Sequence, residues 1–389
     1  MKIKLRPEFE LVLRSARARS SENDGRILGL LREGLDWDRA MACAREHKLT
    51  AFLHQRFTVL DASPLAADQI QTLAESARDL AKNNLWFMGE MLWLHGTFHD
   101  AGIPAVPFKG PALAWLAYRD FALRTCVDLD FVVPQRHIPE TVALLQGHGF
   151  TPQFDPAEAQ AGQHGPAPGQ YAIAPSEKHK FLELHTERTL RYFSHPLNLE
   201  EVNSRLIPLQ IGGQILQSFS VEDLLVMLSV HGAKHFWERL AWVLDIAKLA
   251  EAREVDWQLV KQIAAKMEST RVLLLGLSLA HDLFGARLPG PMLEDIARDR
   301  AVAVLANKVY GQYVGNADPG AGVLPRAAFR FQSRDGIGQG LRHTLRLAFS
   351  PTESDRQTVR LPHWLAPLYI FVRPWRLLRE YGSGLKRRE

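Results

Sequence analysis

Two acidic residues, Asp128 and Asp130, lie in a short apolar segment and are the strongest candidates for chemistry in this sequence. Residues 127–133 alternate apolar and acidic side chains, a pattern typical of a β-strand. Residues two apart in a strand point to the same face, so the two carboxylates are expected to project together. Neighbouring carboxylates repel each other unless a cation binds between them, and oxygen ligands suit Mg²⁺. The pattern therefore predicts a site for Mg²⁺ (or Mn²⁺), and its plain alternative is a solvated strand edge.

A third carboxylate is expected from the segment Phe181-Leu-Glu-Leu-His185, which is a second strand candidate. If Leu182 and Leu184 face the core, Glu183 and His185 share the opposite face. Glu183 is then the candidate third metal ligand and catalytic residue. His185 is expected to contact the substrate or the metal ligands.

Lys109, Gly110 and Arg124 precede the acidic strand and are candidates for binding nucleotide phosphates. Lys109 offers a point charge, and Gly110 allows a close approach of the backbone to a ligand. Two of these residues have an ordinary alternative. Lys109 could be a surface lysine, and Arg124 could pair with Asp120 or Asp128.

Further polar residues recur downstream at intervals of four, three, four and three: His231, His235, Glu238, Trp242 and Asp245. In one continuous helix this spacing places them on a single face. The pattern predicts a polar wall that closes the site and contacts the acceptor or the metal. A buried hydrogen-bonded network that ties two domains together is the equal alternative.

Hydrophobic periodicity predicts an α+β fold, with a small mixed-sheet core flanked by helical regions. The expected parts are a helical N-terminal region (1–100), the core (101–215), a helical C-terminal region (216–330) and a basic amphipathic C-terminal arm (331–389). In the core, strands are expected at 103–108, 127–133 and 180–185, and helices at 111–118 and 138–148. Residues 155–170 and 314–340 are rich in glycine and proline and are expected to be loops.

Composition indicates which classes of protein and of partner fit this chain. Of the 389 residues, 46% are hydrophobic and 23% charged, which is typical of a globular protein. The net charge of +4 comes without a broad basic face, which argues against nucleic acid as a partner. The two cysteines, Cys43 and Cys126, form no metal-binding pattern. We find neither the apolar run of a signal peptide nor a membrane-spanning segment, so the sequence predicts a soluble, cytoplasmic protein.

The sequence resembles the nucleotidyltransferase superfamily that includes the polymerase-β-like enzymes, and within it an uncharacterised bacterial family found near exopolysaccharide and peptide biosynthesis genes. The matching segments span roughly residues 85–250 and are Lys109-Gly-Pro-Ala-Leu-Ala, Arg124 with Asp128-Leu-Asp130, Leu182-Glu-Leu-His185, and His231-Gly-Ala-Lys-His235 with Trp242-Val-Leu-Asp245. The resemblance implies that the core transfers a nucleoside monophosphate from an NTP, with Mg²⁺. The acceptor stays open between a small molecule, a glycan precursor, a peptide and a protein.

One departure from the superfamily keeps alternatives open. The superfamily usually places Gly-Ser after its first strand, whereas this chain has Lys109-Gly110 and no serine. A degenerate nucleotide-binding or scaffold protein of the same fold is therefore one alternative. An Asp-x-Asp glycosyltransferase-like enzyme is another. The pairs His99-Asp100 and His281-Asp282 would suit a phosphohydrolase, but they lie in ordinary amphipathic helices.

The C-terminal arm combines aromatic residues with arginines, at Trp364, Tyr369, Phe371 and Trp375. This composition fits an arm that packs on the rest of the protein, which we favour. It also fits contact with a membrane surface or a partner protein.

Overall fold

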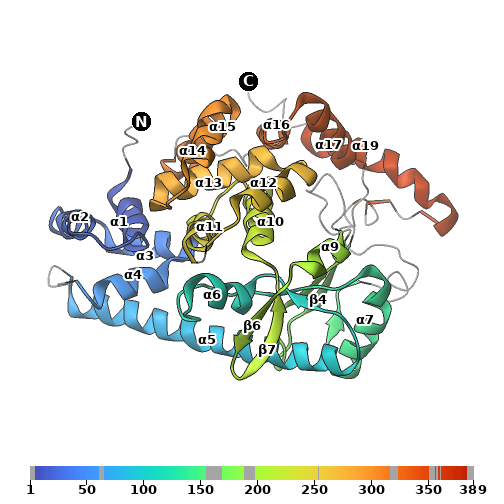
Figure 1. The fold of residues 1–389 in the computed structure, drawn as a ribbon, viewed down its shortest axis with the longest axis horizontal. Coiled ribbons are helices and arrows are strands. Elements are labelled where there is room, and N and C mark those ends of the chain that lie inside the picture. Colours follow the sequence, from blue (N-terminus) through green and yellow to red (C-terminus); the bar gives the residue numbers. More distant parts are fainter. Residues whose placement is uncertain are drawn as a thin grey trace.

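The computed structural model describes residues 5–60, 65–154, 169–187, 198–252, 254–315, 323–349 and 361–382, with Asp355, Thr358 and Val359. A five-stranded mixed sheet and a two-stranded hairpin lie among helices from both ends of the chain (Figure 1). The predicted α+β fold is confirmed. Buried apolar side chains form one continuous cluster that runs from Phe9 to Phe329.

Five helices precede the sheet: α1 (Pro7–Ser15), α2 (Ser21–Arg32), α3 (Trp37–Glu46), α4 (Thr50–Phe57) and α5 (Ala67–Asp100). Asp36 caps α3 by accepting a hydrogen bond from the Arg39 amide, as its sequence position predicts. The 34-residue α5 runs along one side of the molecule and contacts both α4 and α6 (Figure 1).

The main sheet has the strand order β1-β2-β5-β4-β3. Its strands are β1 (Val106–Pro107), β2 (Leu129–Val132), β3 (Thr151–Pro152), β4 (Gln170–Ala174) and β5 (Leu182–His185). Only β2 and β5 pair in parallel, and the other neighbours are antiparallel. Helices α6 (Gly110–Tyr118) and α7 (Ile138–Gly147) follow β1 and β2, close to their predicted bounds.

The strands differ from the sequence prediction in two ways. They are shorter than expected, so Asp128 lies one residue before β2 rather than within it. Strands β3 and β4 were not predicted, because β3 has two residues and both strands flank residues 155–170, where composition indicates a loop. Of that expected loop, residues 155–168 lie outside the described residues.

A short helix and a hairpin lie in the described part of the segment between the sheet and the C-terminal helices. Helix α9 (Leu199–Ser204) precedes β6 (Ile207–Ile211) and β7 (Gln214–Ser218). The two-residue turn Gly212-Gly213 has positive φ angles of 56° and 81°, which suits a tight hairpin turn. The sequence analysis did not predict this hairpin.

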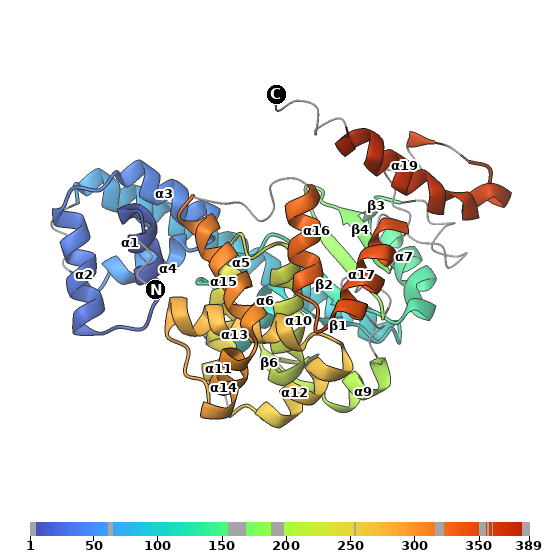
Figure 2. The same ribbon diagram turned by 90° about the horizontal axis from the view of Figure 1, so that it is seen from above.

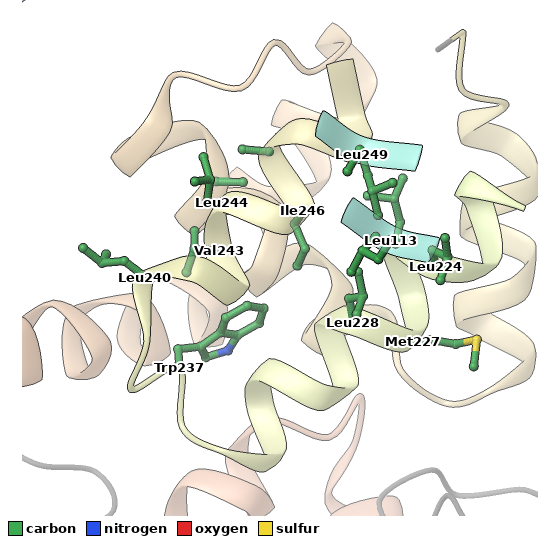
Figure 3. Close-up of a cluster of buried hydrophobic side chains, with 14 of the residues drawn as sticks. Leu113, Leu224, Met227, Leu228, Trp237, Leu240, Val243, Leu244, Ile246 and Leu249 are labelled. Atoms are coloured by element: carbon green, nitrogen blue, oxygen red, sulfur yellow. The ribbon is translucent and has the colours of Figure 1, made fainter. Parts of the chain in front are cut away.

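Six helices follow: α10 (Val221–Lys234), α11 (Leu240–Ala252), α12 (Trp257–Lys266), α13 (Thr270–Phe284), α14 (Gly290–Arg298) and α15 (Arg300–Tyr313). Trp237, in the turn between α10 and α11, is fully buried and points into an apolar cluster that includes Leu228 and Ile246 (Figure 3). Two glycines make room for its indole. A Cβ atom on Gly232 would clash with the ring, and one on Gly276 would lie 3.0 Å from it.

The expected loop at 314–340 is wrong for most of its described part, which contains α16 (Val323–Gln332) and the start of α17 (Ile337–Phe349). Its arginine and glycine content obscured the apolar positions that hold α16 in place. Phe329 of α16 is fully buried and packs on Phe236, with ring centroids 5.4 Å apart.

The described part of the C-terminal arm includes the 3₁₀ segment η2 (His363–Leu368) and helix α19 (Tyr369–Gly382). Helix α19 contacts α17 and lies at the periphery of the molecule (Figure 2). The buried carboxylate of Asp355 accepts hydrogen bonds from Arg373 and Arg376 of α19. Within the described part of the chain, no helix combines the length and the apolar character needed to cross a bilayer.

Candidate active site

A tight turn after β1 places Lys109 and Gly110 directly against the start of β2. The Phe108 amide donates a hydrogen bond to the Asp130 carbonyl oxygen, at 2.9 Å. Gly110 begins α6 with a positive φ of 56°, and a Cβ atom there would lie 3.3 Å from the Asp128 carbonyl oxygen. Two features therefore favour glycine at position 110: the left-handed backbone conformation and the close approach to the next strand.

An acidic cluster lies across the two parallel strands. Asp130 of β2 is in register with Glu183 of β5, so their side chains project from adjacent positions of one sheet face. Leu182 and Leu184 are fully buried on the opposite face, as the alternation of β5 predicts. His185 Nε2 lies 2.7 Å from Asp130 Oδ1 and 3.4 Å from Glu183 Oε2.

Two further residues hold this cluster. The Lys109 ammonium nitrogen lies 3.0 Å from Asp130 Oδ1, which links the turn after β1 to the acidic strand. Gln170 of β4 donates a hydrogen bond from Nε2 to Glu183 Oε2, at 2.7 Å. The three central strands thus contribute side chains to one polar network.

The charges of the cluster are strongly coupled. Burial and the neighbouring Asp130 carboxylate raise the pKa of Asp128 to about 6. Burial also opposes ionisation of Asp130, but the Lys109 charge and the His185 hydrogen bond outweigh it and hold its pKa below the ordinary value. In turn, despite burial, Asp130 and Glu183 raise the pKa of His185. Asp130 therefore stays ionised at lower pH than Asp128 does.

The donor atoms fit a divalent cation. One ligand atom each from Asp130, Glu183 and His185 lies within 4.8 Å of the others. Asp130 Oδ2 is buried and has no hydrogen-bond partner among the described residues, so it carries an uncompensated lone pair. Carboxylate oxygens are the ligands that Mg²⁺ and Mn²⁺ favour. Asp128 lies outside this group of three and lines the cavity beside it.

A cavity of about 240 Å³ adjoins the cluster and collects most of the remaining candidate residues. Lys109 belongs to both, since it pairs with Asp130 and also lines the cavity. The lining residues are Lys48, Lys109, Arg124, Thr125, Val127, Asp128, His231, His235, Glu238, Arg239, Ala241, Trp242 and Asp245.

The expectation of one continuous helix through residues 231–245 is wrong. Helix α10 ends at Lys234 and α11 begins at Leu240, and Phe236 and Trp237 between them have φ angles of 56°. The burial of the Trp237 indole against Gly232 favours this turn over continued helix. The polar residues nevertheless meet in the cavity, because the turn brings the ends of both helices to one wall.

Three rings of that wall contact one another. The centroids of His231 and His235 are 4.9 Å apart, and the Trp242 centroid lies 5.3 Å from the first and 5.1 Å from the second. Burial and nearby cations lower the pKa of His231 well below its ordinary value, and they lower that of His235 to about 3. Both imidazoles are therefore neutral near pH 7 and offer one donor and one acceptor nitrogen each.

Arg124 pairs with Asp245 rather than with Asp120 or Asp128. Its Nε lies 3.0 Å from Asp245 Oδ1, and its Nη2 donates to Asp245 Oδ2 at 3.1 Å. The Tyr118 hydroxyl also donates to Asp245 Oδ1, at 2.6 Å. This buried network ties α6 and the segment before β2 to α11, which is the structural alternative considered for Asp245.

Asn84 of α5 positions the acidic strand and was missed in the sequence analysis. Its Nδ2 donates to the carbonyl oxygens of Phe121 and Arg124, at 2.6 and 2.9 Å, and its Oδ1 accepts from the Cys126 amide at 3.1 Å. The signal was an asparagine on the apolar face of a long helix, since a buried amide requires partners.

Within the described part of the chain, the contacts of the two His-Asp pairs do not involve the acidic cluster. The side chains of His99 and Asp100 are exposed at the end of α5. His281 Nδ1 contacts the Ala286 carbonyl oxygen. Among the described residues, neither pair joins a group of three or more side chains that could hold a metal.

The fold and the site together define an α+β enzyme core that presents carboxylates from two parallel strands beside a Lys-Gly turn. The model of the uncharacterised nucleotidyltransferase family matches residues 33–285, which is well over half of the chain. The chain therefore belongs to this family of nucleotidyltransferases. No curated protein matches it. The match includes α3 to α5 and α10 to α13, so the helices that wall the cavity are part of the family region.

Proposed function

We propose that the protein moves a nucleoside monophosphate from an NTP to an acceptor and releases pyrophosphate, in a reaction that depends on Mg²⁺ or Mn²⁺. The observation that carries this proposal is the buried, unpartnered Oδ2 of Asp130 beside Glu183 on the neighbouring strand. Asp130 and Glu183 would hold the cation, and Asp128, which lines the adjoining cavity, would be the third carboxylate to reach it. Bound there, the cation would neutralise phosphate charge and polarise the α-phosphate towards attack.

The protein residues have distinct parts in this reaction. The charge of Lys109 and the positive N-terminal end of α6, which begins at Gly110, favour phosphate oxygens beside the cluster. His185 holds Asp130 ionised and in a fixed orientation. Glu183 is held through Oε2 by Gln170, and no hydrogen bond from the described residues reaches its Oε1. We infer that this oxygen acts as the general base and accepts the proton of the attacking hydroxyl or amine of the acceptor.

Arg124 contributes through position rather than through direct phosphate contact. Its charge is balanced by Asp245, and its Nη1 lies 3.5 Å from the Gly110 carbonyl oxygen. It thereby supports the turn that begins α6. His231, His235 and Asp245 line the cavity from the side of α10 and α11.

One observation favours a second candidate, a protein that binds nucleotide without transferring it. The Lys109 ammonium already pairs with Asp130 Oδ1, where it balances the carboxylate charge as a metal ion would. Such a protein would bind NTPs equally well with and without Mg²⁺.

The proposal is tested by calorimetric and thermal-shift titration of the full chain with each NTP, with and without Mg²⁺. The same titrations are run on Asp130→Asn and on Asp100→Asn, an exposed acid at the end of α5. A ligand that binds only the folded protein raises its melting temperature. We expect Mg²⁺-dependent stabilisation of the wild type and of Asp100→Asn, and its loss in Asp130→Asn. Stabilisation independent of Mg²⁺ supports the second candidate, and the absence of any NTP effect refutes both.

A further inference from the structure

Two cations from outside the sheet, Lys48 and Arg239, line the cavity opposite the acidic strand. Lys48 lies in the turn between α3 and α4, and Arg239 in the turn between α10 and α11. Neither belongs to the sheet core that presents the carboxylates. Their meeting at one wall is therefore produced by the way the helical regions pack.

His47 fixes the relative position of the two turns. Its carbonyl oxygen accepts a hydrogen bond from the Ala241 amide at 3.3 Å, and its Nδ1 accepts one from the Leu240 amide at 3.4 Å. Lys48 itself adopts the left-handed conformation, with φ of 59°. The Leu49 amide closes this turn on the Ala44 carbonyl oxygen at 2.8 Å. Lys48 is thus held at the start of α11, next to Arg239, in a backbone conformation that a lysine rarely adopts.

The two cations lack a counterion in the part of the chain that the structure describes. No ion pair joins Lys48 or Arg239 to a carboxylate there, although three acids also line the cavity: Asp128, Asp245, which pairs with Arg124, and Glu238 from an exposed position. The Arg239 guanidinium instead lies 5.5 Å from the Trp242 ring centroid. Both side chains line one cavity, and burial together with the charge of Arg239 lowers the pKa of Lys48. An anion in the cavity would relieve this repulsion.

The rest of the cavity suits phosphate oxygens. Lys109 faces it from the sheet side, and the neutral imidazoles of His231 and His235 can each donate one hydrogen bond. At about 240 Å³ the cavity is smaller than the roughly 300–1,000 Å³ typical of pockets for whole drug-sized ligands. It therefore suits part of a ligand, such as a chain of phosphates, better than a complete nucleotide.

We propose that Lys48 and Arg239 form a phosphate subsite for the nucleotidyl-transfer reaction, in which they bind the distal phosphates of the NTP. This inference rests on the proposed function for its ligand, but it concerns residues that the carboxylate site does not use. A phosphate group carried by the acceptor shares the same chemistry. The site would then be completed by three separate parts of the chain: the α3–α4 turn, the sheet and the α10–α11 turn.

The test compares three probes by calorimetry: inorganic tripolyphosphate without metal, each NTP with Mg²⁺, and the corresponding NMP with Mg²⁺. The variants are Lys48→Gln and Arg239→Gln, with Lys82→Gln and Arg298→Gln as matched charge removals at exposed positions. Melting temperatures without ligand establish that each variant is folded.

We expect each cavity variant to weaken tripolyphosphate binding at least tenfold, since hydrogen bonds to charged groups contribute roughly that factor. Both control variants should bind as the wild type does. If NTP binding weakens in parallel while NMP binding does not, the subsite holds the distal phosphates of the nucleotide. If NTP binding is unchanged while tripolyphosphate binding weakens, the subsite serves a phosphate on the acceptor.

Unchanged tripolyphosphate binding in both cavity variants would overturn the inference. The Asp130→Asn variant separates this result from failure of the proposed function. If Asp130→Asn loses Mg²⁺-dependent NTP binding while Lys48→Gln and Arg239→Gln have no effect on binding, the phosphate subsite is refuted and the proposed function is not. If tripolyphosphate binding depends on Lys48 and Arg239 but the protein does not bind Mg²⁺-NTP, the proposed transfer reaction is refuted and the phosphate subsite is not.

Discussion

Arg124 and Asp245 form a buried, two-pronged ion pair between residues 121 positions apart in the sequence. The pair joins the segment that leads into the acidic strand to the helix that walls the cavity. Because both side chains are nearly inaccessible, neither charge can be solvated if the other is removed.

Asp245→Ala is therefore expected to be severely destabilising. Loss of one partner of a buried pair costs about 3–5 kcal/mol in the free energy of unfolding, because the other charge stays buried and uncompensated. Urea denaturation measures this cost. The control is Glu294→Ala, which removes an exposed ion pair with Arg298 and should change stability by less than about 1 kcal/mol. Equal effects of the two substitutions would contradict the role of the buried pair.

Gly110→Ala should reduce nucleotide binding more than its effect on stability accounts for. Gly110 and Gly102 both have positive φ angles, of 56° and 69°, so an alanine strains the backbone by about 1–2 kcal/mol at either position. Only at Gly110 does the added Cβ atom approach the Asp128 carbonyl oxygen, whereas Gly102 has open space around it. Calorimetric NTP titration of both variants separates the two effects. A Gly102→Ala protein that loses binding equally would argue against a local effect on the acidic strand.

Gly232→Ala is expected to destabilise the protein, although alanine is ordinarily the better helix former. Its Cβ atom would overlap the Trp237 ring, and overpacking of a core costs about 1–3 kcal/mol. Gly89→Ala in α5 meets nothing within 4 Å and should instead stabilise the protein by roughly 0.5–1 kcal/mol. Opposite signs in thermal unfolding are the expected outcome. Two stabilising substitutions would mean that the indole does not pack against α10.

The stability of the protein should fall on mild acidification, and His47 should account for part of this fall. Burial and the charge of Arg239 lower the pKa of His47 to about 4 in the folded protein, below its usual value of roughly 6.5. The unfolded chain then binds more protons between these two values, so stability is complete above about pH 6.5 and is lost towards pH 4.

The slope that His47 adds in this window is at most about 1.4 kcal/mol per pH unit. Urea denaturation across that pH range should show a shallower dependence for His47→Gln than for the wild type. The exposed His99→Gln serves as the control and should leave the dependence unchanged. An unaltered slope in His47→Gln would show that this imidazole is not kept neutral by the fold.

Local patterns in the sequence predicted the elements that are long or strongly periodic, and they predicted the acidic face of β5. The Asp36 cap and the helix after Lys109-Gly110 follow from short-range rules, and the structure confirms both. The turn at Trp237 could not be predicted from spacing alone. It depends on two glycines, Gly232 and Gly276, and one of them lies on a different helix. Tertiary packing overrides the helical period there.

The candidate site shows the same division. The register that places Asp130 beside Glu183 requires β5 to be the parallel neighbour of β2, and the sequence only suggested this pairing. The partner of Arg124 could not be found among nearby acids, because it comes from a helix more than a hundred residues away. Lys48, in the turn between α3 and α4, and Asn84, in α5, both precede the core, so a search for chemistry confined to the acidic segment overlooks them.

The separation of Arg124 from Asp245 also has a consequence for synthesis of the chain. Both strands of the acidic cluster leave the ribosome before α11, which carries Asp245 and follows Arg239. Contacts between such distant residues form late, because the intervening chain must first be ordered. A nascent chain that already displays its carboxylates therefore has no closed cavity for a substrate. We expect the enzyme to acquire its activity only once translation has passed α11, which carries Asp245, so products truncated before it would remain inert.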